Sequence, residues 1–451
     1  MPQEKFHYKS LEEIKQRAAE LGVDLPFAAD THALAQPLTV RNITFPNRLG
    51  IAPMEGADST PEGAPTEYTT RRYVNEAIGG SSVIWFEAIS IVEEGRSSQT
   101  QLLLTRDTLD EFKKMTTAVK EAGLKANGYA PYLIMQANHS GRYSNPGNQP
   151  APMIAYRHPI LEQYRAADDS CIVTDDYLKG LEEKFGEATK LAKEAGFDAV
   201  DIKSCHGYLL AELASAYNRP GEYGGSFENR FRLLQNGIRA AKVYEDDSFM
   251  VTARVGIYDG YAYPWGFGVS PESGMTPDWT EPIRLVRDLH NELGLNMVNL
   301  TMGNPYATTH VTRPFDFGKY EPDEHPFVGL SRMIHGIGAA KKAVPEMTVW
   351  ASAPTYLRAY ADLFSAGAVE QGLCDGMLFG RMAFADPDFA NEIVKNGRID
   401  PKRVCLTCGK CGDLIRAHKP TGCVIRDSKT FMPFYKEFLE IKKTQPANFR
   451  G

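Results

Sequence analysis

Four of the seven cysteines lie within one stretch, CLTCGKCGDLIRAHKPTGC, at residues 405–423. Their spacing is C-x2-C-x2-C-x11-C, formed by Cys405, Cys408, Cys411 and Cys423. Structural zinc sites usually pair two C-x2-C units across a longer loop. Three cysteines at successive two-residue gaps, followed by a distant fourth, are instead typical of ligands to a [4Fe–4S] cluster. The spacing therefore predicts an iron–sulfur segment, with zinc or four unligated thiols as the alternatives.

The other cysteines, Cys171, Cys205 and Cys374, are scattered, and an odd total does not indicate a disulfide framework. The formal charge of −7 argues against a general affinity for nucleic acid or for anionic membranes. The N-terminus lacks the apolar core of a signal peptide, and no unbroken apolar run of about 18 residues is present. We therefore expect a reduced, cytoplasmic protein without a membrane span.

Eight short apolar runs are expected to be strands, and segments of helical period separate them. The runs are residues 49–54, 82–91, 131–138, 197–204, 248–256, 296–302, 347–353 and 374–381. The clearest helical segments, DYLKGLEEKFGEATKLAKEAG and EPIRLVRDLHNELG, each end near a glycine, where a helix can terminate in the left-handed conformation. Nearly continuous apolar strands that alternate with helices predict a parallel sheet covered by helices.

Eight such units in about 330 residues favour an α/β fold of the closed (β/α)8 TIM barrel type. A doubly wound open sheet is the alternative, but the first strand turn, APMEGADSTPEG, carries no G-x-G-x-x-G fingerprint. The predicted organisation is an N-terminal helical extension over residues 1–35, a barrel over residues 36–400 and a cysteine-rich segment over residues 401–451.

The active site of such a barrel forms at the C-terminal ends of its strands. The residues expected there are Pro53, Met54, Ala88, Gln136, His139, Lys203, His206, Tyr208, Arg254, Gly380 and Arg381. This set combines hydrogen-bonding groups with three cations, which predicts an anionic or carbonyl-bearing ligand. The alternative is structural: the arginine in the strand pairs with a carboxylate, and His139 caps a loop.

Four blocks of sequence resemble, in order, the signatures of the old yellow enzyme family of FMN-dependent oxidoreductases. They are FPNRLGIAPM, QANHSGRYS, HGYLLAELASAYNRPGEYGGSFENRFR and CDGMLFGRMAFADPDF. The resemblance runs from about residue 36 to residue 427 and implies FMN bound noncovalently over the barrel mouth.

The resemblance also implies roles for single residues. Pro53, Met54 and Ala88 would line the flavin ring, Gln136 would bind its pyrimidine edge, Arg254 would lie near N1, and Gly380 and Arg381 would contact the phosphate. A fixed cation near N1 stabilises the anionic reduced flavin. Relatives carry a glycine-rich turn after strand seven, whereas this chain reads WASAPTYLRAY, with Ser352 and Ala353 in that turn. TYLRAY is expected to begin a helix whose amides face the phosphate.

For the substrate, the resemblance points to KSCHGY, which contains Lys203, His206 and Tyr208. Two donors would polarise a carbonyl oxygen, and the tyrosine would supply a proton. Lys203 replaces the usual histidine with a longer, charged donor. Its structural alternative is an ion pair with Asp201 or Glu87. Tyr306 either borders the substrate pocket or only closes the barrel rim.

The cysteine run resembles that of the iron–sulfur branch of the family, which includes 2,4-dienoyl-CoA reductase, enoate reductase and trimethylamine dehydrogenase. This implies a [4Fe–4S] cluster that passes single electrons to or from FMN. No nucleotide-binding fingerprint follows the cysteines. The expected electron donor is a ferredoxin, a flavodoxin or a flavoprotein, with direct reduction by NAD(P)H as the alternative.

The predicted function is therefore an ene-reductase that reduces the C=C bond of an α,β-unsaturated carbonyl compound, such as an enone, enoate, steroid or flavonoid, in an anaerobic setting. One alternative is an amine dehydrogenase of the trimethylamine dehydrogenase type, whose aromatic cage would include Trp350 and Tyr306. The other alternative is a non-catalytic electron-transfer subunit.

Overall fold

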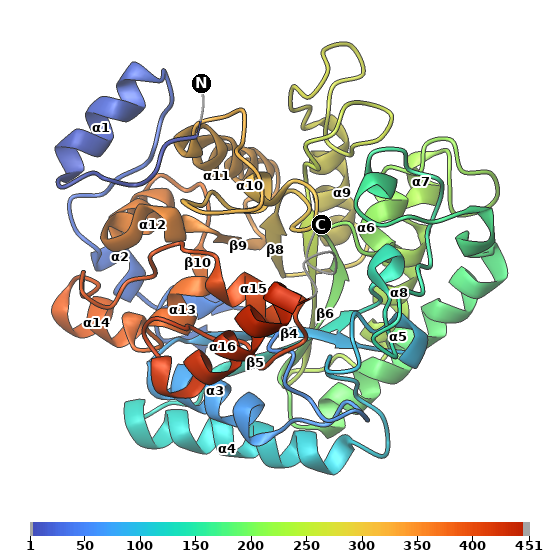
Figure 1. The fold of residues 1–451 in the computed structure, drawn as a ribbon, viewed down its shortest axis with the longest axis horizontal. Helices are drawn as coiled ribbons and strands as arrows, with labels where there is room; N and C mark the ends of the chain where they lie inside the picture. The colour runs from blue at the N-terminus through green and yellow to red at the C-terminus, as the bar shows by residue number, and fades with distance from the viewer. Residues whose placement is uncertain (1–2, 445–451) are drawn as a thin grey trace.

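A closed barrel of eight parallel strands forms the centre of the protein in a computed structural model that describes residues 3–444 (Figure 1). The strands are β3 (Leu49–Ile51), β4 (Val83–Ser90), β5 (Tyr132–Asn138), β6 (Ala199–Ser204), β7 (Met250–Gly256), β8 (Met297–Thr301), β9 (Thr348–Ser352) and β10 (Gly376–Phe379). They follow one another around the barrel in chain order, and β10 closes it against β3. Every strand lies within its predicted range, so the (β/α)8 prediction is confirmed.

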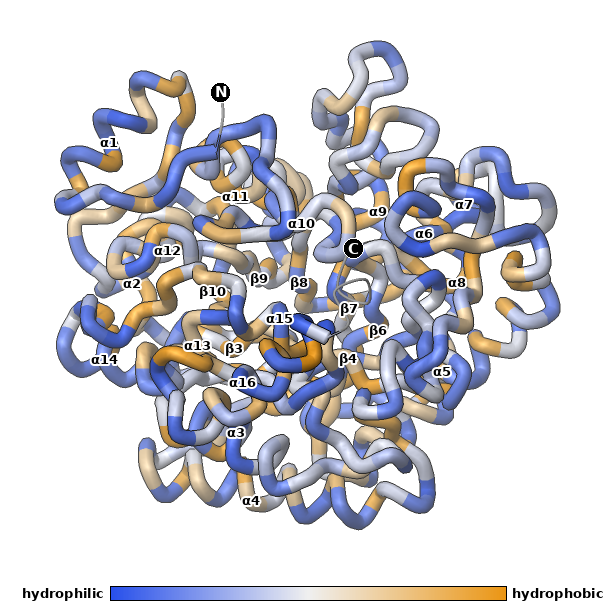
Figure 2. Tube along the Cα trace, in the orientation of Figure 1, coloured by the Kyte–Doolittle hydropathy of each residue, from blue (hydrophilic) through white to orange (hydrophobic). Residues whose placement is uncertain are grey.

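One long helix follows each strand and covers the outside of the barrel (Figure 1). These helices are α3 (Glu67–Ile78), α4 (Leu109–Asn127), α5 (Asp175–Glu194), α8 (Arg232–Lys242), α9 (Thr280–Asn291), α11 (Pro326–Ala343), α12 (Ala361–Glu370) and α14 (Phe389–Asn396). Several of them, such as α3 and α4, alternate hydrophilic and hydrophobic residues along the chain (Figure 2). Such a helix buries one face against the strands and leaves the other in water.

The N-terminal extension contains α1 (Leu11–Glu20) and α2 (His32–Ala35), and α1 begins where the Ser10 side chain accepts a hydrogen bond from Glu13 N. An antiparallel hairpin of β1 (Leu38–Val40) and β2 (Ile43–Phe45) follows. Phe45 packs edge-to-face on Trp350 inside the barrel, with ring centroids 6.1 Å apart. The hairpin therefore closes the N-terminal end of the barrel with apolar side chains, which leaves the opposite end for a site.

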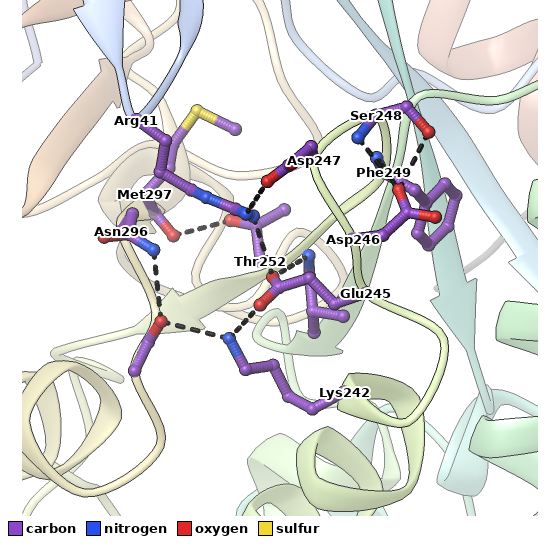
Figure 3. A network of polar contacts seen from close by, with 12 residues as sticks. Arg41, Lys242, Glu245, Asp246, Asp247, Ser248, Phe249, Thr252, Asn296 and Met297 are labelled. Carbon is purple, nitrogen blue, oxygen red and sulfur yellow. Dashed lines mark hydrogen bonds and ion pairs between the residues drawn. The ribbon is translucent and has the colours of Figure 1, made fainter.

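A polar network holds this hairpin in place (Figure 3). In the hairpin turn, Arg41 Nη1 lies 3.7 Å from Glu245 Oε1, and Arg41 Nη2 lies 3.6 Å from Asp247 Oδ1. Both acidic residues belong to the segment that leads into β7. Glu245 also accepts a hydrogen bond from Val251 N at 2.9 Å and pairs with Lys242. The hairpin is thus tied to the start of a barrel strand.

The cysteine-rich segment packs on the barrel near the loop that follows β3. It contains α15 (Lys410–Arg416) and α16 (Ser428–Thr444), which lie in front of α3 and α13 (Arg381–Ala385) in Figure 1. Thr421 N donates to Gly56 O at 2.8 Å, and Arg71 on α3 pairs with Asp427 at 2.7 Å. The cysteines therefore lie at the end of the barrel where the sequence predicts the active site.

Across residues 3–444, no helix is long and apolar enough to cross a membrane.

Candidate active site

The register of the barrel brings the predicted rim residues together. Ala88 is paired with Gln136 across β4 and β5, and Lys203 is paired with Arg254 across β6 and β7. Gln136 is in turn opposite Asp201 on β6. These side chains therefore share one end of the barrel, as expected for residues at the C-terminal ends of barrel strands.

Asp201 is a buried carboxylate that organises this rim. It accepts hydrogen bonds from Trp85 Nε1 at 2.7 Å, from Gln136 Nε2 at 2.6 Å and from the backbone N–H of Arg254 at 2.5 Å. Burial nevertheless raises the pKa of Asp201 above its usual value. Asp201 thus orients Gln136 and the Arg254 backbone.

Arg254 presents a buried cation without a matching anion. The side chain is 5% exposed, its Nε has no hydrogen-bond partner, and burial lowers its pKa. Because an unpaired buried guanidinium is costly, this arrangement favours an anionic ligand at the barrel mouth. The structural alternative for Arg254, an ion pair with a carboxylate, does not form among the described residues.

Lys203 is a second cation beside Arg254. It is 5% exposed, and its Nζ lies 3.7 Å from the centroid of the Tyr208 ring. Burial lowers the pKa of Lys203 to about 8. The alternative partners are engaged elsewhere within residues 3–444: Asp201 binds Trp85 and Gln136, and Glu87 pairs with Arg72 at 2.5 Å. Lys203 is therefore free to meet a ligand.

A tight turn holds His206 and Tyr208 at the end of β6. His206 and Gly207 have φ values of +67° and +70°, and a Cβ added to Gly207 would lie 2.1 Å from Asn304 Nδ2. Glycine is required there because the loop after β8 packs directly against the turn. His206 Nε2 lies 3.4 Å from Thr301 Oγ1, and burial together with Arg254 lowers the pKa of His206 well below its usual value. His206 is thus a neutral imidazole near pH 7.

Tyr208 is hydrogen-bonded on two sides. Its hydroxyl donates to Glu55 Oε1 at 3.0 Å and lies 2.8 Å from the Tyr306 hydroxyl. Ser97 Oγ also donates to Glu55, at 3.1 Å. Burial and the Glu55 carboxylate raise the pKa of Tyr208 well above its usual value. The sequence analysis missed Glu55, although it directly follows Pro53 and Met54 in the loop after β3.

The loop after β9 leads into the predicted helix start. Ala353 is left-handed, with φ +73°, and a 3-10 helix, η5 (Pro354–Tyr360), follows before α12 begins at Ala361. Arg358, with φ +51°, interrupts the helical path. The Tyr356 hydroxyl donates to Glu4 O at 2.6 Å, so the N-terminal extension packs on this turn. A helix therefore does begin in TYLRAY, as a 3-10 helix with a kink at Arg358, and Ser352 and Ala353 directly precede it.

Gly380 and Arg381 follow β10 at the start of α13. A Cβ at Gly380 would lie 3.0 Å from Met54 Sδ, so the glycine lets the loop after β3 approach closely. Arg381 Nε is buried without a hydrogen-bond partner. Arg313, in the loop before α11, has a buried Nη1 that also lacks a partner, and burial together with Arg381 lowers the pKa of Arg313 to about 9. The sequence analysis missed Arg313, since nothing in its local motif marks it.

Cys405, Cys408, Cys411 and Cys423 line one cavity, together with Arg381. The backbone N–H of Thr407 donates to Cys405 Sγ at 3.4 Å, and that of Arg426 donates to Cys423 Sγ at 3.3 Å. Burial raises the pKa of Cys405 to about 12. All seven cysteines are free thiols. Within the described chain, no group of three or more His, Cys, Asp or Glu residues is arranged to hold a metal ion.

Two predicted side chains do not serve the site in the expected way. His139 is buried, accepts from Gly141 N at 3.0 Å and contacts the Tyr177 hydroxyl at 2.9 Å, so it stabilises a loop, as its structural alternative states. Trp350 is fully buried, with Nε1 3.2 Å from Met297 Sδ and its ring against Phe45. The expected cage of Trp350 and Tyr306 is therefore wrong, because Trp350 packs against the hairpin at the closed end of the barrel.

The closed eight-stranded barrel with polar residues at the ends of its strands is the architecture of the old yellow enzyme type. Residues 33–265 match the model of the NADH:flavin oxidoreductase / NADH oxidase family, and the chain belongs to this family. This confirms the resemblance found in the sequence.

Curated relatives include two proteins named NADPH dehydrogenase. The one from Bacillus velezensis is 33% identical over 223 residues, which are 48% of this chain and 62% of the relative. The one from Bacillus subtilis is 32% identical over 231 residues, 50% of this chain and 64% of the relative. The chain thus matches slightly less than two thirds of the length of these relatives.

Three solved structures share the fold at 18–20% sequence identity. A 2-naphthoyl-CoA reductase complex has a TM-score of 0.71, covering 90% of this chain and 58% of the neighbour. Histamine dehydrogenase from Rhizobium sp. 4-9 has a TM-score of 0.65, with 87% and 52% covered. An old yellow enzyme homologue from Zymomonas mobilis has a TM-score of 0.60, with 81% and 94% covered.

Proposed function

We propose that this protein is an FMN-dependent ene-reductase that reduces the C=C bond of an α,β-unsaturated carbonyl compound and receives electrons through a [4Fe–4S] cluster. The observation that carries the proposal is the convergence of Lys203, His206 and Tyr208 on the rim that also holds the unpaired Arg254. It combines carbonyl-polarising donors, a proton donor and a cation suited to a reduced flavin.

The donor set fits FMN. Bound FMN would supply hydride to the alkene. Arg254 would neutralise the charge of the reduced ring, and Gln136, held by Asp201, would bind the ring edge. Arg381 and Arg313 both have buried, unpartnered guanidinium nitrogens, and they would bind the phosphate. Pro53, Met54 and Ala88 are the proposed ring-lining residues, with Ser352, Ala353 and Gly380 near the phosphate.

The substrate carbonyl would accept hydrogen bonds from Lys203 and His206. Because burial keeps His206 neutral, it would donate through a single ring N–H. Both bonds strengthen as negative charge develops on the carbonyl oxygen, and Lys203 adds a full positive charge. Tyr208 then donates its proton to the α-carbon.

The proposed cluster would be held by the four cysteines. A [4Fe–4S] cluster is a multi-atom cage, so its four thiolates surround a larger volume than the ligands of one ion do. The position of all four cysteines on one cavity supports the proposal. The amide bonds to Cys405 and Cys423 would help to set the potential of a cluster.

A ferredoxin, a flavodoxin or a flavoprotein would deliver electrons to this cluster, and NAD(P)H is the alternative donor. A cytoplasmic, low-oxygen setting suits such a chain of carriers. The position of Trp350 and the free Lys203 cation both disfavour an amine dehydrogenase, because a methylated ammonium would meet a positive charge and lack a cage.

The test begins with anaerobically purified protein. Its absorbance before and after dithionite should show flavin bands and a broad iron–sulfur absorbance that bleaches. The reduced protein is then mixed with an enone, an enoate, a steroid enone and a flavone, and flavin re-oxidation is followed. Tyr208→Phe should slow re-oxidation about 100-fold or more while leaving flavin reduction nearly unchanged. Equal loss in both half-reactions would contradict the role of Tyr208, and absence of flavin would contradict the proposed function.

A further inference from the structure

We propose that Tyr306 and Glu55 complete a proton-supply chain to Tyr208, in which Tyr306 returns a proton to Tyr208 and Glu55 holds the Tyr208 hydroxyl in line. This inference rests on the proposed function and assigns roles to two residues of the same site. It starts from three hydroxyl and carboxylate groups that arrive from separate loops, after β3, β6 and β8.

The hydrogen bonds give the chain a direction. The Tyr208 hydroxyl donates to Glu55 Oε1 at 3.0 Å, which leaves the Tyr208 oxygen to accept from the Tyr306 hydroxyl at 2.8 Å. Glu55 is itself held by Ser97 Oγ at 3.1 Å. The order along the hydrogen bonds is therefore Tyr306, Tyr208, Glu55.

Once Tyr208 has given up its proton, the resulting tyrosinate is high in free energy. The side chain is 4% exposed, and the Glu55 carboxylate lies next to its oxygen. A tyrosinate here would be both desolvated and repelled, in keeping with the strongly raised pKa of Tyr208. Lys203 above the ring offsets only part of this cost. Rapid return of a proton from a neighbouring group removes the cost of this buried tyrosinate.

Tyr306 is suited to deliver that proton. Tyr306 as a whole residue is 39% exposed, whereas Tyr208 is buried, so Tyr306 brings the chain to the protein surface. Its ring stacks on Tyr143, with centroids 3.8 Å apart and an interplanar angle of 16°. Its backbone N–H donates to Asn304 Oδ1 at 2.9 Å. These contacts fix the Tyr306 ring and hold its hydroxyl on Tyr208.

In the proposed function, bound FMN would supply the hydride for a new C–H bond at the β-carbon, and the substrate would be left as an enolate. The Tyr208 O–H would turn from Glu55 toward the substrate, and the enolate electron pair would take its proton to form a second C–H bond at the α-carbon as the O–H bond breaks. The Tyr208 oxygen takes the proton of Tyr306, and Tyr306 takes one from water. One proton from solvent is consumed for each alkene reduced.

The test compares Tyr306→Phe with Tyr143→Phe in the flavin-loaded protein. Both remove one hydroxyl and keep the stacked rings, but the Tyr143 hydroxyl accepts from Asn304 Nδ2 and lies outside the chain. With 2-cyclohexen-1-one as the probe, Tyr306→Phe should slow flavin re-oxidation about 10- to 100-fold and change its solvent isotope effect. Flavin reduction should stay within about 2-fold, and Tyr143→Phe should leave both half-reactions within about 2-fold.

Glu55 is tested by graded replacement. Glu55→Gln keeps an acceptor oxygen for the Tyr208 hydroxyl and should retain most of the re-oxidation rate, whereas Glu55→Ala removes the acceptor and should slow it. Equal rates in the two variants would contradict the orienting role of Glu55.

A readout without turnover separates this chain from the proposed function. With ¹³C at the tyrosine Cζ, the NMR signal of Tyr208, assigned by its loss in Tyr208→Phe, should move in Tyr306→Phe and stay in Tyr143→Phe. An unmoved signal, or a wild-type re-oxidation rate in Tyr306→Phe, would overturn the chain. A wild-type protein that reduces none of the alkenes while the signal still moves would contradict the proposed function and leave the hydrogen-bonded chain standing.

Discussion

Lys203 and Tyr208 lie against each other at the barrel mouth, with the lysine Nζ 3.7 Å from the centroid of the tyrosine ring. The contact places a cation beside the proposed proton donor, and within residues 3–444 no carboxylate forms a direct ion pair with this lysine. It also fixes the direction of a long side chain, because the ring offers its negative face to the ammonium group. Four predictions follow from such buried charges and from the cysteine cavity.

Lys203→Met should stabilise the ligand-free protein. Burial lowers the pKa of Lys203 from 10.5 to about 8, so at pH 7 the folded state carries a charge that the unfolded state solvates better. An apolar side chain of similar length removes this cost, and we expect the unfolding free energy to rise by roughly 1–3 kcal/mol. Urea unfolding at pH 7 measures it.

The matched control for this change is Lys120→Met. Lys120 pairs with Asp198 at 2.6 Å, so its replacement should not raise the unfolding free energy. A stability loss in Lys203→Met at pH 7 would show that the buried ammonium has a partner after all.

Arg254→Met should make the flavin harder to reduce. In the proposed function the cation would stabilise the anionic reduced ring, so its loss should lower the midpoint potential by tens of millivolts, since about 30 mV corresponds to about 1.4 kcal/mol for a two-electron couple. Arg254→Lys keeps a charge and should lower the potential less. Potentiometric titration with reference dyes measures the shift, and identical potentials in all three proteins would exclude Arg254 from the flavin ring.

Cys408→Ala should remove the proposed iron–sulfur cluster. Each ligand thiolate holds one corner of a [4Fe–4S] cluster, so we expect iron and acid-labile sulfide to fall by about half or more after anaerobic purification. Cys171→Ala is the control, because Cys171 lies far along the chain and outside the cysteine cavity. Iron analysis and the electron paramagnetic resonance spectrum after dithionite provide the measurement. Zinc in the wild-type protein would refute the cluster.

Glu76→Gln should stabilise the protein at alkaline pH. Burial raises the pKa of Glu76 to about 8, and its Oε2 lacks a hydrogen-bond partner. Between about pH 4.5 and pH 8 the folded state therefore holds a proton that the unfolded state has released, so stability falls as pH rises through this window. Glutamine stays neutral, so the unfolding free energy of the variant should exceed that of the wild type by roughly 2–4 kcal/mol at pH 9.

Glu67→Gln is the control for this pH dependence, since Glu67 is exposed in the first turn of the same helix. It should change the unfolding free energy by less than about 0.5 kcal/mol at any pH. Denaturant unfolding from pH 5 to pH 9 measures both variants, and parallel pH profiles for wild type and Glu76→Gln would contradict the prediction.

The eight strands could be predicted from sequence because a parallel barrel buries both faces of each strand. Continuous apolar runs such as VIWFEAIS in β4 are the direct result, and every residue of that strand is buried. The placement of Lys203 and Arg254 at one end also followed from the sequence, since both end neighbouring strands of the same barrel.

The loops could not be predicted in the same way. The helix after β9 begins as a 3-10 helix behind a left-handed Ala353, and its Tyr356 hydroxyl donates to Glu4 O, 352 positions away along the chain. Trp350 was assigned to a substrate cage, yet the barrel register and the hairpin place it in the closed end. A local motif holds no information on such long-range contacts.

The sequence by itself determined the barrel, its family and the set of residues on its rim, because strand burial and strand ends are local properties of the chain. Only the tertiary structure decided which of those residues meet. Glu55 and Tyr306 reach Tyr208 across 153 and 98 residues, and the four cysteines surround a cavity that also includes Arg381. Closure of the barrel brings the separate loops together, and their packing against one another sets the distances on which proton and electron transfer depend.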